Sequence, residues 1–354
     1  MRLLALALFA ASLTAAQSPP LRLAIVGLVH GHVDGFLNAA LKRADVQIVG
    51  VSDPNPALRK KYAARFGLPE TIFVADMTAM LDRAKPEAVA IFTSTQDHAA
   101  AVEAAAAKRV PAMMEKPLAV DMEHARRIDR AARQAGIPVI VNYETTWYRS
   151  HAEMWRIFKE RKQAGEIRKM VAMDGHQGPQ EIHVQPEFLA WLTDPRQNGA
   201  GALFDFGCYG ANLMTWLMDN QRPLAVTALV NTDKPRIYPK VDDEATILVQ
   251  YPAAQGIIQA SWNWPYSRKD LEVYGEKEYA IATGGDKLRL GDQPQPLPEL
   301  APDMRDSISY LTAVARGKKQ PSGLSSLENN LIVTEILAAA RESAATGRTI
   351  RFTK

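Results

Sequence analysis

The sequence predicts an α/β protein, in which a doubly wound parallel sheet is followed by an α+β domain with a mostly antiparallel sheet. Up to about Tyr143, short apolar runs alternate with helical stretches, which is the pattern of strands joined by helices across a parallel sheet. Beyond Tyr143, runs with strand character follow one another at hairpin-like spacing, which indicates antiparallel pairing. We therefore expect two domains, spanning residues 20–143 and 144–354.

Six strands are predicted in the first domain. The first runs from Leu21 to Val26 and ends at a turn that contains glycine, and the second runs from Val46 to Val51 with Asp53 just beyond its end. This succession of strand, turn, helix and strand is typical of the opening of a nucleotide-binding fold. The later strands are expected at 72–74, 88–92, 110–114 and 139–142, and the helices between strands end near residues 43, 66, 83, 108 and 136.

The second domain groups its strands and helices into separate runs. A helix is predicted from His151 to Gly165, with apolar side chains on one side. Strands are expected at 170–173, 225–230, 245–251, 256–262 and 271–274, and a loop rich in proline and charge at 291–302. Two closing helices, at about 304–316 and 326–346, are expected to pack back toward the first domain.

The composition is that of an ordinary globular protein. Apolar residues make up 47% and charged residues 23% of the 354 residues, which leaves ample material for a core in each domain. The net charge of +3 is small and no run of lysines or arginines stands out, which argues against a nucleic-acid-binding surface. Cys208 is the only cysteine, so we expect no disulfide framework.

Residues 1–17 have the pattern of a secretory signal peptide. Arg2 gives a positive start, an apolar stretch follows, and small residues lead to a cleavage point near Ala16. The apolar stretch is too short to span a bilayer, and no run of about twenty apolar residues occurs elsewhere. We therefore expect a periplasmic or secreted protein that makes no membrane contact after the signal peptide is removed.

The segment Met114-Glu115-Lys116-Pro117 is the first candidate for chemistry. It follows an apolar run that starts at Val110 and precedes a helix that opens at Asp121. A strand that ends in a Glu-Lys pair before a proline places an ammonium group at the carboxyl edge of a parallel sheet, where doubly wound folds bind their ligands. Lys116 is therefore the leading candidate catalytic residue. The alternative is an ordinary surface lysine in a strand-to-helix turn.

The first turn, Gly27-Leu28-Val29-His30-Gly31-His32, departs from a dinucleotide fingerprint. In the fingerprint the second glycine lets the backbone approach the pyrophosphate and the third permits close helix packing, but Val29 and His32 stand at these positions. Asp53 favours a dinucleotide, because a carboxylate at the end of the second strand accepts the ribose hydroxyls and repels a 2'-phosphate. It thereby favours NAD over NADP. The alternative for Asp53 is a helix-capping turn.

Small hydroxyl residues and a histidine follow the fourth strand, in the segment 93–98, and are expected at the same sheet edge. Asp97 in this segment is alternatively a helix N-cap. The predicted lining of the cofactor cleft consists of Gly27, Val29, His30, Gly31, His32, Asp53, Thr93, Ser94, Thr95, His98, Glu115 and Lys116.

A second motif lies in the segment 199–212, where small residues lead into a helix. Asp205, Tyr209 and Asn212 are spaced by four and three residues, which places them on one face of that helix. A carboxylate and a phenol one turn apart make a proton-transfer pair if the phenol pKa falls below its usual value of about 10, and a nearby ammonium such as Lys116 would lower it. The alternative is a buried helix in which the aspartate caps and the tyrosine packs.

Together these motifs resemble the Gfo/Idh/MocA family over essentially the whole chain after the leader. The resemblance rests on Glu115-Lys116-Pro117, the glycine-rich lead into 205–209, the run Asp242-Asp243-Glu244-Ala245, and Ser261-Trp262. It implies an N-terminal Rossmann domain, a C-terminal domain with a large, open, mostly antiparallel sheet, and an active-site lysine at Lys116. Many members carry histidine at the position that matches Tyr209, whereas glucose-fructose oxidoreductase and its relatives carry tyrosine.

The resemblance implies an exported NAD(P)-dependent oxidoreductase that transfers a hydride between a hydroxyl carbon of a sugar or sugar derivative and a tightly bound nicotinamide cofactor. Lys116, Tyr209 and Asp205 are the expected catalytic residues, with the phenol taking the hydroxyl proton and the carboxylate orienting the sugar or the base. The expected substrate contacts are Asn142, Tyr143, His176, Trp191, Asn212 and Trp262. The alternatives are glycoside cleavage by oxidation and elimination, and a non-catalytic secreted sugar-binding protein.

Three further expectations concern metal, cofactor and assembly. The chain has histidines that can reach one cleft, but no pair has a familiar helical ligand spacing, so no metal site is expected; these residues are His30, His32, His98, His176 and His183. NAD is the expected cofactor, with NADP as the alternative. The open sheet of the family is often buried between subunits, so the resemblance implies a homodimer or a homotetramer.

Overall fold

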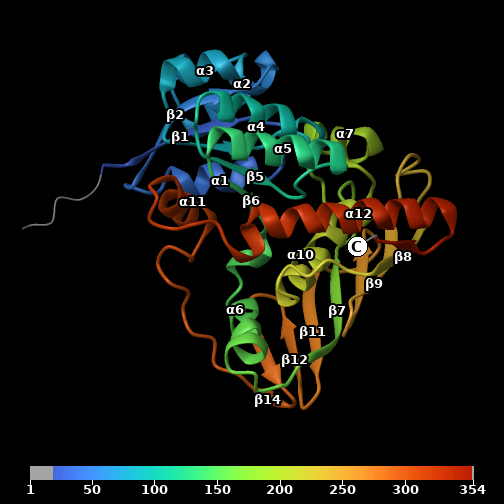
Figure 1. Ribbon diagram of the computed structural model, residues 1–354. Helices are drawn as coiled ribbons and strands as arrows, with labels where there is room; N and C mark the ends of the chain where they lie inside the picture. Colours follow the sequence, from blue (N-terminus) through green and yellow to red (C-terminus); the bar gives the residue numbers. More distant parts are fainter. Residues whose placement is uncertain (1–18, 353–354) are drawn as a thin grey trace, which may run out of the picture.

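Six parallel strands form the first sheet of the computed structural model, which describes residues 19–352 (Figure 1). They are β1 (Leu21–Val26), β2 (Val46–Ser52), β3 (Phe73–Val74), β4 (Ala88–Ile91), β5 (Ala112–Glu115) and β6 (Val139–Asn142). Their order is β3-β2-β1-β4-β5-β6, which confirms the doubly wound parallel sheet. The strand order reverses between β1 and β4, and such folds bind ligands at the carboxyl ends beside that reversal. The predicted leader, residues 1–17, lies outside the described residues.

Helices cover both faces of this sheet because its strands send alternate side chains into two apolar clusters. Leu23 and Ile25 of β1 belong to one cluster, and Ala24 and Val26 to the other. The first cluster is covered by α1 (Val33–Ala40), α2 (Pro56–Phe66) and α11 (Ser307–Ala315), and the second by α3 (Met77–Ala84), α4 (His98–Ala107) and α5 (Met122–Ala135). A helix from the far end of the chain, α11, therefore closes the first sheet.

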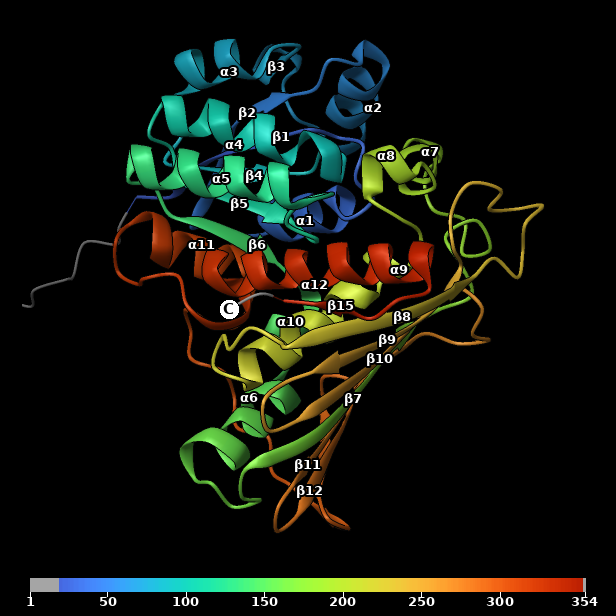
Figure 2. The same cartoon turned by 45° about the vertical axis from the view of Figure 1, so that its right-hand side comes forward.

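A nine-stranded sheet forms the second layer of strands (Figure 2). Its order is β14-β13-β12-β11-β7-β10-β9-β8-β15, and β7 and β10 are its only parallel neighbours, so the mostly antiparallel sheet is confirmed. The strands are β7 (Ile167–Gly175), β8 (Ala225–Asn231), β9 (Glu244–Gln250), β10 (Gln255–Ser261), β11 (Arg268–Gly275), β12 (Tyr279–Thr283), β13 (Lys287–Leu290), β14 (Gln293–Pro294) and β15 (Ile350–Arg351).

The long helix α12 (Leu327–Thr346) lies between the two sheets and contacts both domains (Figure 2). Beside it, α10 (Gly207–Leu217) packs on β7 and β10. Arg341 of α12 donates hydrogen bonds to the Val120 carbonyl at 3.1 Å and to the Gly199 carbonyl at 2.9 Å. One guanidinium thus joins the segment that follows β5 to the glycine-rich segment of the second domain. Within the described residues, no helix combines the length and the apolar character needed to cross a bilayer.

The structure differs from the sequence expectations mainly at the edges of the second domain. The helix predicted over 151–165 is shorter: α6 covers Arg149–Trp155, continues as a π-helical turn to Glu160, and then ends. Four strands were not predicted, namely β12, β13, β14 and β15, and β14 falls inside the predicted loop at 291–302. These strands are two to five residues long, so they offer few positions over which a period can be detected. The helix α11 begins at Ser307 rather than near 304, because the Asp306 side chain caps it.

Candidate active site

Lys116 and Asp205 form a buried ion pair between the two domains. Lys116 follows β5 at the carboxyl edge of the first sheet, and Asp205 ends the short helix α9 (Ala202–Asp205). The Lys116 Nζ lies 2.5 Å from Asp205 Oδ1 and 3.0 Å from the Asp205 carbonyl oxygen. Trp262 Nε1 donates to the other carboxylate oxygen at 3.0 Å. The fold therefore pairs two of the three residues that the sequence proposed for catalysis, and the third, Tyr209, lies beside them.

Each member of this pair keeps the other charged. Burial favours the neutral amine, but the Asp205 carboxylate outweighs it and raises the pKa of Lys116 above its ordinary value. Burial likewise opposes ionisation of Asp205, but Lys116 outweighs it and lowers the pKa of that carboxyl. At neutral pH the pair is consequently an ammonium and a carboxylate.

The pair borders a cavity of about 240 Å³ that is lined from both domains. Lys269 of β11 also faces this cavity, although the sequence analysis did not single it out. Its position depends on the pairing of β11 with β7, where it lies opposite Asp174, and no local pattern reveals that pairing. The lining residues are Gly31, His32, Lys116, His176, Pro179, Ile182, Val184, Gln185, Phe188, Leu192, Asp205, Phe206, Tyr209 and Lys269.

Tyr209 lines the same cavity, but its electrostatics differ from the prediction. The Nζ atoms of Lys116 and Lys269 lie 5.1 and 4.9 Å from the centre of its ring. Burial raises the pKa of Tyr209 well above its ordinary value. The prediction that Lys116 lowers this pKa is therefore wrong, because the amine is paired with Asp205 and cannot offset the loss of water around the phenol. The phenol therefore stays protonated at neutral pH and can donate a hydrogen bond.

His176 is a neutral donor at the edge of the cavity. Burial lowers its pKa, with opposing contributions from nearby charges. Its Nδ1 accepts the Gly178 N–H at 2.9 Å, so the proton of the neutral ring is assigned to Nε2. The ring packs edge-on against Phe206, with the ring centres 4.8 Å apart. A ring held in this way can donate to a substrate hydroxyl.

Asn212 does not lie in this cavity. Its side chain is fully buried and donates to the Leu324 carbonyl at 2.8 Å and to the Asn330 side chain. The helix is interrupted between Asp205 and Gly207, so Asp205, Tyr209 and Asn212 do not share one continuous helix face as predicted. Asn212 therefore joins α10 to the C-terminal segment, and the structure contradicts its proposed contact with the substrate.

The predicted aromatic substrate contacts are packed, and the two indoles are hydrogen-bonded. Trp262 is 0% exposed and its indole is committed to Asp205. Trp191 is 4% exposed and its indole donates to the Val29 carbonyl at 3.2 Å. Tyr143 is buried with its ring edge-on to that of Tyr209, at 5.5 Å between centres. These rings shape the cavity from behind, and none of them presents a free face for stacking on a sugar.

The turn after β1 is covered by the second-domain helix α7 (Pro186–Leu192). His30 is 1% exposed, and its ring centre lies 4.8 Å from that of Phe188 and 5.4 Å from that of Trp191. A side chain added at Gly31 would come within 2.7 Å of the Phe188 ring. The backbone that approaches pyrophosphate in a dinucleotide fold is thus in contact with protein here.

Ion pairs extend this contact to α2. Lys61 of α2 lies 2.7 Å from Glu187 of α7, and Arg65 lies 2.9 Å from Asp34. Gln185, at the start of α7, donates to the same Asp34 carboxylate at 3.2 Å. The contacts between α7 and the first domain therefore run from the turn toward the region beyond β2.

Several other predicted cofactor contacts are held by their neighbours. Asp53 is 2% exposed, and its two oxygens accept the Leu28 and Asn55 N–H groups at 2.8 Å each. The Ser94 hydroxyl donates to Asp97 at 2.7 Å, and His98 Nδ1 lies 3.2 Å from the Leu118 carbonyl. Thr95 is buried beside Asn198, at 3.4 Å, and the Thr93 hydroxyl donates to the Ser94 carbonyl. These residues support the sheet edge more than they present free groups to a ligand.

The two ends of the edge therefore suit a dinucleotide differently. At the β5 end, Lys116 faces an open cavity that is lined from both domains. At the β1 end, a pyrophosphate reaches the backbone of residues 27–32 only if α7 moves away from Gly31. The residues available to hold the cofactor are those of the turn and Glu115.

Two family models match the chain. The model described as "Oxidoreductase family, NAD-binding Rossmann fold" matches residues 21–143, and the model described as "GFO/IDH/MocA C-terminal domain" matches residues 155–281. The two matches adjoin each other and together cover most of the chain. They fall on the two sheets described above.

Two curated relatives are similar over part of their length. The dTDP-3,4-didehydro-2,6-dideoxy-alpha-D-glucose 3-reductase of Streptomyces antibioticus is 27% identical over 194 residues, which are 54% of this chain and 55% of that protein. The D-apiose dehydrogenase of Rhizobium rhizogenes is 32% identical over 100 residues, 28% of each chain. The matches thus span about half and about a quarter of these relatives.

Solved structures share the fold over nearly the full chain. The aldose-aldose oxidoreductase from Caulobacter crescentus, complexed with glycerol, superposes with a TM-score of 0.80 at 20% identity and covers 94% of this chain and 100% of its own. An inositol dehydrogenase homolog from Azotobacter vinelandii, complexed with NAD+, superposes with a TM-score of 0.78 at 19% identity and covers 95% and 98%. At these identities the likeness concerns the fold.

Proposed function

Because the chain belongs to the Gfo/Idh/MocA family of NAD-binding oxidoreductases, we propose that it is an NAD(P)-dependent oxidoreductase acting on a CH–OH group of a sugar or sugar derivative. The observation that supports this most directly is the Lys116–Asp205 pair at the wall of a cavity shared by the two domains. A buried ammonium held next to a small polar cavity is suited to an oxygen atom that gains negative charge. We further propose that the chain lies near the glucose-fructose oxidoreductase subgroup, because it carries Tyr209 where many members carry histidine.

Lys116 is the proposed proton donor. A bound nicotinamide cofactor supplies or accepts the hydride at the carbon. In the reducing direction, the Lys116 ammonium gives one proton to the carbonyl oxygen of the substrate, and the amine regains a proton from water. In the oxidising direction, the Lys116 ammonium first gives a proton to water, and the free amine then takes the hydroxyl proton. Asp205 holds the ammonium in place and keeps it charged. This assignment replaces Tyr209 as the base.

His176, Tyr209 and Gln185 are proposed to orient the substrate, since they line the cavity and carry groups that form hydrogen bonds. A cavity of about 240 Å³ is small, which fits a monosaccharide or a similar polyol better than a long chain. Hydroxyl-rich ligands need several donors and acceptors, and this lining supplies them.

Export is part of the proposal, because residues 1–17 have the pattern of a secretory leader. N-terminal sequencing of the protein from the periplasm or the medium of its host tests it. A mature chain beginning just after Ala16 supports export, and a chain retained in the cytoplasm with its leader intact contradicts it.

A homo-oligomer is also proposed. The exposed face of the second sheet carries Leu229 and Leu248, which are 74% and 48% exposed on the paired strands β8 and β9. Exposed leucines on a flat sheet suit contact with a second copy of the chain. Light scattering tests this, and a monomer at micromolar concentration contradicts it.

The cofactor is tested directly. Protein purified without added nucleotide is denatured, and the supernatant is examined by absorbance and mass spectrometry for NAD or NADP. Released nucleotide, near one per chain, supports the oxidoreductase with a tightly bound cofactor. When none is released, calorimetry with NAD and NADP follows, and failure of both to bind contradicts the proposal.

One observation favours a second candidate, a secreted sugar-binding protein without catalysis. The turn after β1 is covered by α7, and Asp53 is occupied by backbone N–H groups. The two candidates differ in one measurement: the second predicts sugar binding in calorimetry without any binding of NAD or NADP.

A further inference from the structure

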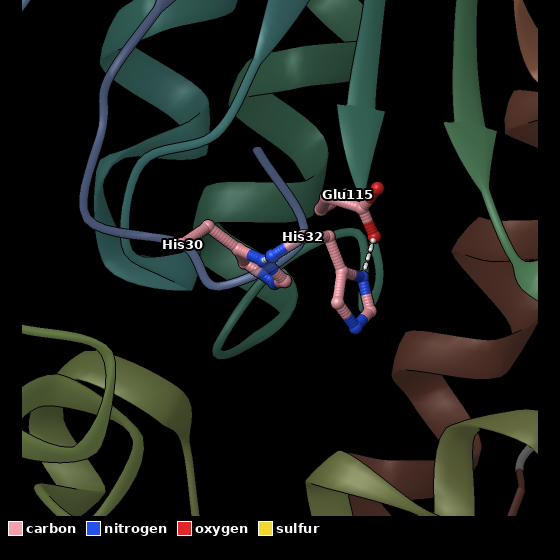
Figure 3. A group of neighbouring side chains, drawn as sticks. All are labelled: His30, His32 and Glu115. Carbon is pink, nitrogen blue, oxygen red and sulfur yellow. Dashed lines mark hydrogen bonds and ion pairs between the residues drawn. The ribbon is translucent and has the colours of Figure 1, made fainter. Parts of the chain in front are cut away.

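The fold brings together three side chains that the sequence separates. His30 and His32 come from the turn after β1, and Glu115 ends β5 (Figure 3). One ligand atom of each residue lies within 4.8 Å of the others. Among the described residues, these three are the group of histidines and carboxylates close enough together to share a metal ion. Spacing along the chain suggested no metal site, because two of the ligands lie two residues apart in a turn and the third is 83 positions further on.

Their contacts orient these side chains toward one another. The His32 Nδ1 lies 2.9 Å from Glu115 Oε2, and Asn142 of β6 donates to the other Glu115 oxygen at 2.7 Å. The His30 Nδ1 accepts the backbone N–H of His32 at 3.2 Å. His30 and Glu115 are 1% and 3% exposed. Two of the three groups are thus rigidly placed, and an amide fixes the carboxylate from behind.

Two imidazoles and a carboxylate make a donor set that selects transition metals. Imidazole nitrogen suits Zn²⁺, Fe²⁺, Co²⁺ and Ni²⁺, whereas Mg²⁺ and Ca²⁺ prefer oxygen ligands alone. Three protein ligands with the remaining positions open are typical of catalytic zinc and non-haem iron sites. Carboxylate ligands of such sites are held by outer hydrogen bonds, as Asn142 holds Glu115 here.

The group is also accessible to small molecules. His32 lines the cavity that holds Lys116 and a second cavity of about 630 Å³, and Glu115 lines the second. Glu144 lines the second cavity as well and adds negative charge near His32. An ion at this position therefore has open positions toward water or a substrate oxygen.

From this geometry we propose that His30, His32 and Glu115 bind one divalent transition-metal ion in the turn that holds pyrophosphate in a dinucleotide fold. The ion would bind between His32 and Glu115, in place of the hydrogen bond that now joins these two side chains. One of the two departures from the dinucleotide fingerprint then has a purpose, because His32 supplies a ligand at that position.

The test uses the full chain, stripped with a chelator and desalted. Co²⁺ is added while visible d–d absorbance is recorded, and Zn²⁺ content is measured by mass spectrometry after desalting. We expect about one ion per chain and, for Co²⁺, an X-ray absorption spectrum that contains scattering from imidazole. Glu115→Gln and His32→Ala should each weaken Co²⁺ binding roughly 100-fold or more, and Asn142→Ala about tenfold.

His183→Ala is the matched control, because His183 is an exposed histidine outside the group. It should bind Co²⁺ as the parent chain does. Thermal melting of every variant checks folding. Where a variant does not fold, the decision rests on the X-ray absorption spectrum of the parent chain. Absence of imidazole scattering, binding no tighter than millimolar, or unchanged binding in both ligand variants would overturn the site. The nucleotide-release test does not depend on this result, so the two proposals fail separately.

Discussion

The turns after β5 and β1 lie at the same edge of the first sheet, but the second domain packs against them differently. At the end of β5, Lys116 reaches across to Asp205 and borders a cavity, in an arrangement that serves chemistry. At the end of β1, the turn that would hold a dinucleotide lies beneath α7, with Phe188 against Gly31. Both turns follow buried parallel strands of the same sheet.

This difference shows that the strand order alone does not determine what an edge binds. The sheet places both turns at the position where doubly wound folds bind ligands. What distinguishes them is the segment that the second domain packs on each: the carboxylate of α9 at one turn and the aromatic side chains of α7 at the other. Changes at each turn can therefore test the contrast.

The largest effect is expected at the β5 end. Lys116→Met should lower the rate of the proposed reaction about 1,000-fold or more, because the substrate oxygen loses its proton donor. It should also lower the free energy of unfolding by about 3–5 kcal/mol, because the Asp205 charge is left buried without a partner. Steady-state kinetics and urea unfolding measure the two effects.

The double variant Lys116→Met with Asp205→Asn separates chemistry from stability. Removing both charges should restore most of the free energy of unfolding while leaving the rate low. If the double variant regains activity, the Lys116 ammonium is not the proton donor. The β5 end then does not differ from the β1 end in its chemistry as proposed.

Acid should lower the free energy of unfolding, in part through a histidine that lies beside the β5 end. Burial lowers the pKa of His98 to about 4, and this ring lies against the Leu118 carbonyl just after Pro117. Burial lowers the pKa of His151 to about 4 as well, in the second domain. The unfolded chain binds these protons near pH 6.5, so stability is complete above about pH 6.5 and falls toward pH 4, by about 3 kcal/mol for each histidine.

Urea unfolding at a series of pH values measures this dependence. His98→Gln keeps a donor for the carbonyl but does not titrate, so it should remove one part of the acid sensitivity, and His151→Gln should remove a similar part. A pH dependence that is unchanged in the double variant would show that these two rings titrate normally in the folded protein.

Two glycines near the start of α1 test whether α7 covers the β1 end. Gly31→Ala should lower the free energy of unfolding by about 1–3 kcal/mol, because the new carbon meets the Phe188 ring and the Gln185 side chain. Gly35→Ala is the matched control: nothing lies within 4 Å of its new carbon, and it should raise the free energy of unfolding by about 0.5–1 kcal/mol. Chemical unfolding compares them.

A double-mutant cycle combines Gly31→Ala with Phe188→Ala. In its presence the cost of Gly31→Ala should largely disappear, because the colliding ring is gone. Equal costs of Gly31→Ala in both backgrounds would mean that α7 does not rest on the turn in solution.

The smallest effect concerns the charges around α7. Lys61 and Glu187 are paired at 2.7 Å, but the lysine side chain is 41% exposed. A double-mutant cycle should assign this pair about 0.2–1 kcal/mol, since exposed ion pairs contribute little. A larger coupling energy would show that charge, more than the aromatic packing at Gly31, holds α7 over the turn.

Much of the first domain could be predicted from the sequence. Its strands are continuous apolar runs buried on both faces, so β1 and β6 were located to the residue and β2 and β5 within a residue or two. Lys116 could be placed at the sheet edge because a strand, a lysine and a proline follow one another directly. The edge strands of the second sheet could not, since Lys287–Leu290 and Gln293–Pro294 are only four and two residues long, too short for a periodic pattern to identify them.

The contacts across the site were beyond local patterns. Phe188 packs against Gly31, and Lys269 lies over the Tyr209 ring. Each contact joins segments more than fifty residues apart, so a local sequence pattern does not predict it. The prediction for the pKa of Tyr209 was wrong because the partner of Lys116 was unknown: Asp205 pairs with the ammonium, and burial together with nearby acidic groups raises the pKa of the phenol. The meeting of His30, His32 and Glu115 is of the same kind.

The return of α11 to the first sheet affects how this protein can be divided. A gene fragment ending at residue 143 would encode all six parallel strands and yet leave part of one apolar face open around β4, because α11 packs against β4 in the whole chain. Such a fragment should aggregate when it is expressed. The first unit that can stand alone is therefore discontinuous in the gene, and a chimera made with a relative has to exchange both pieces together.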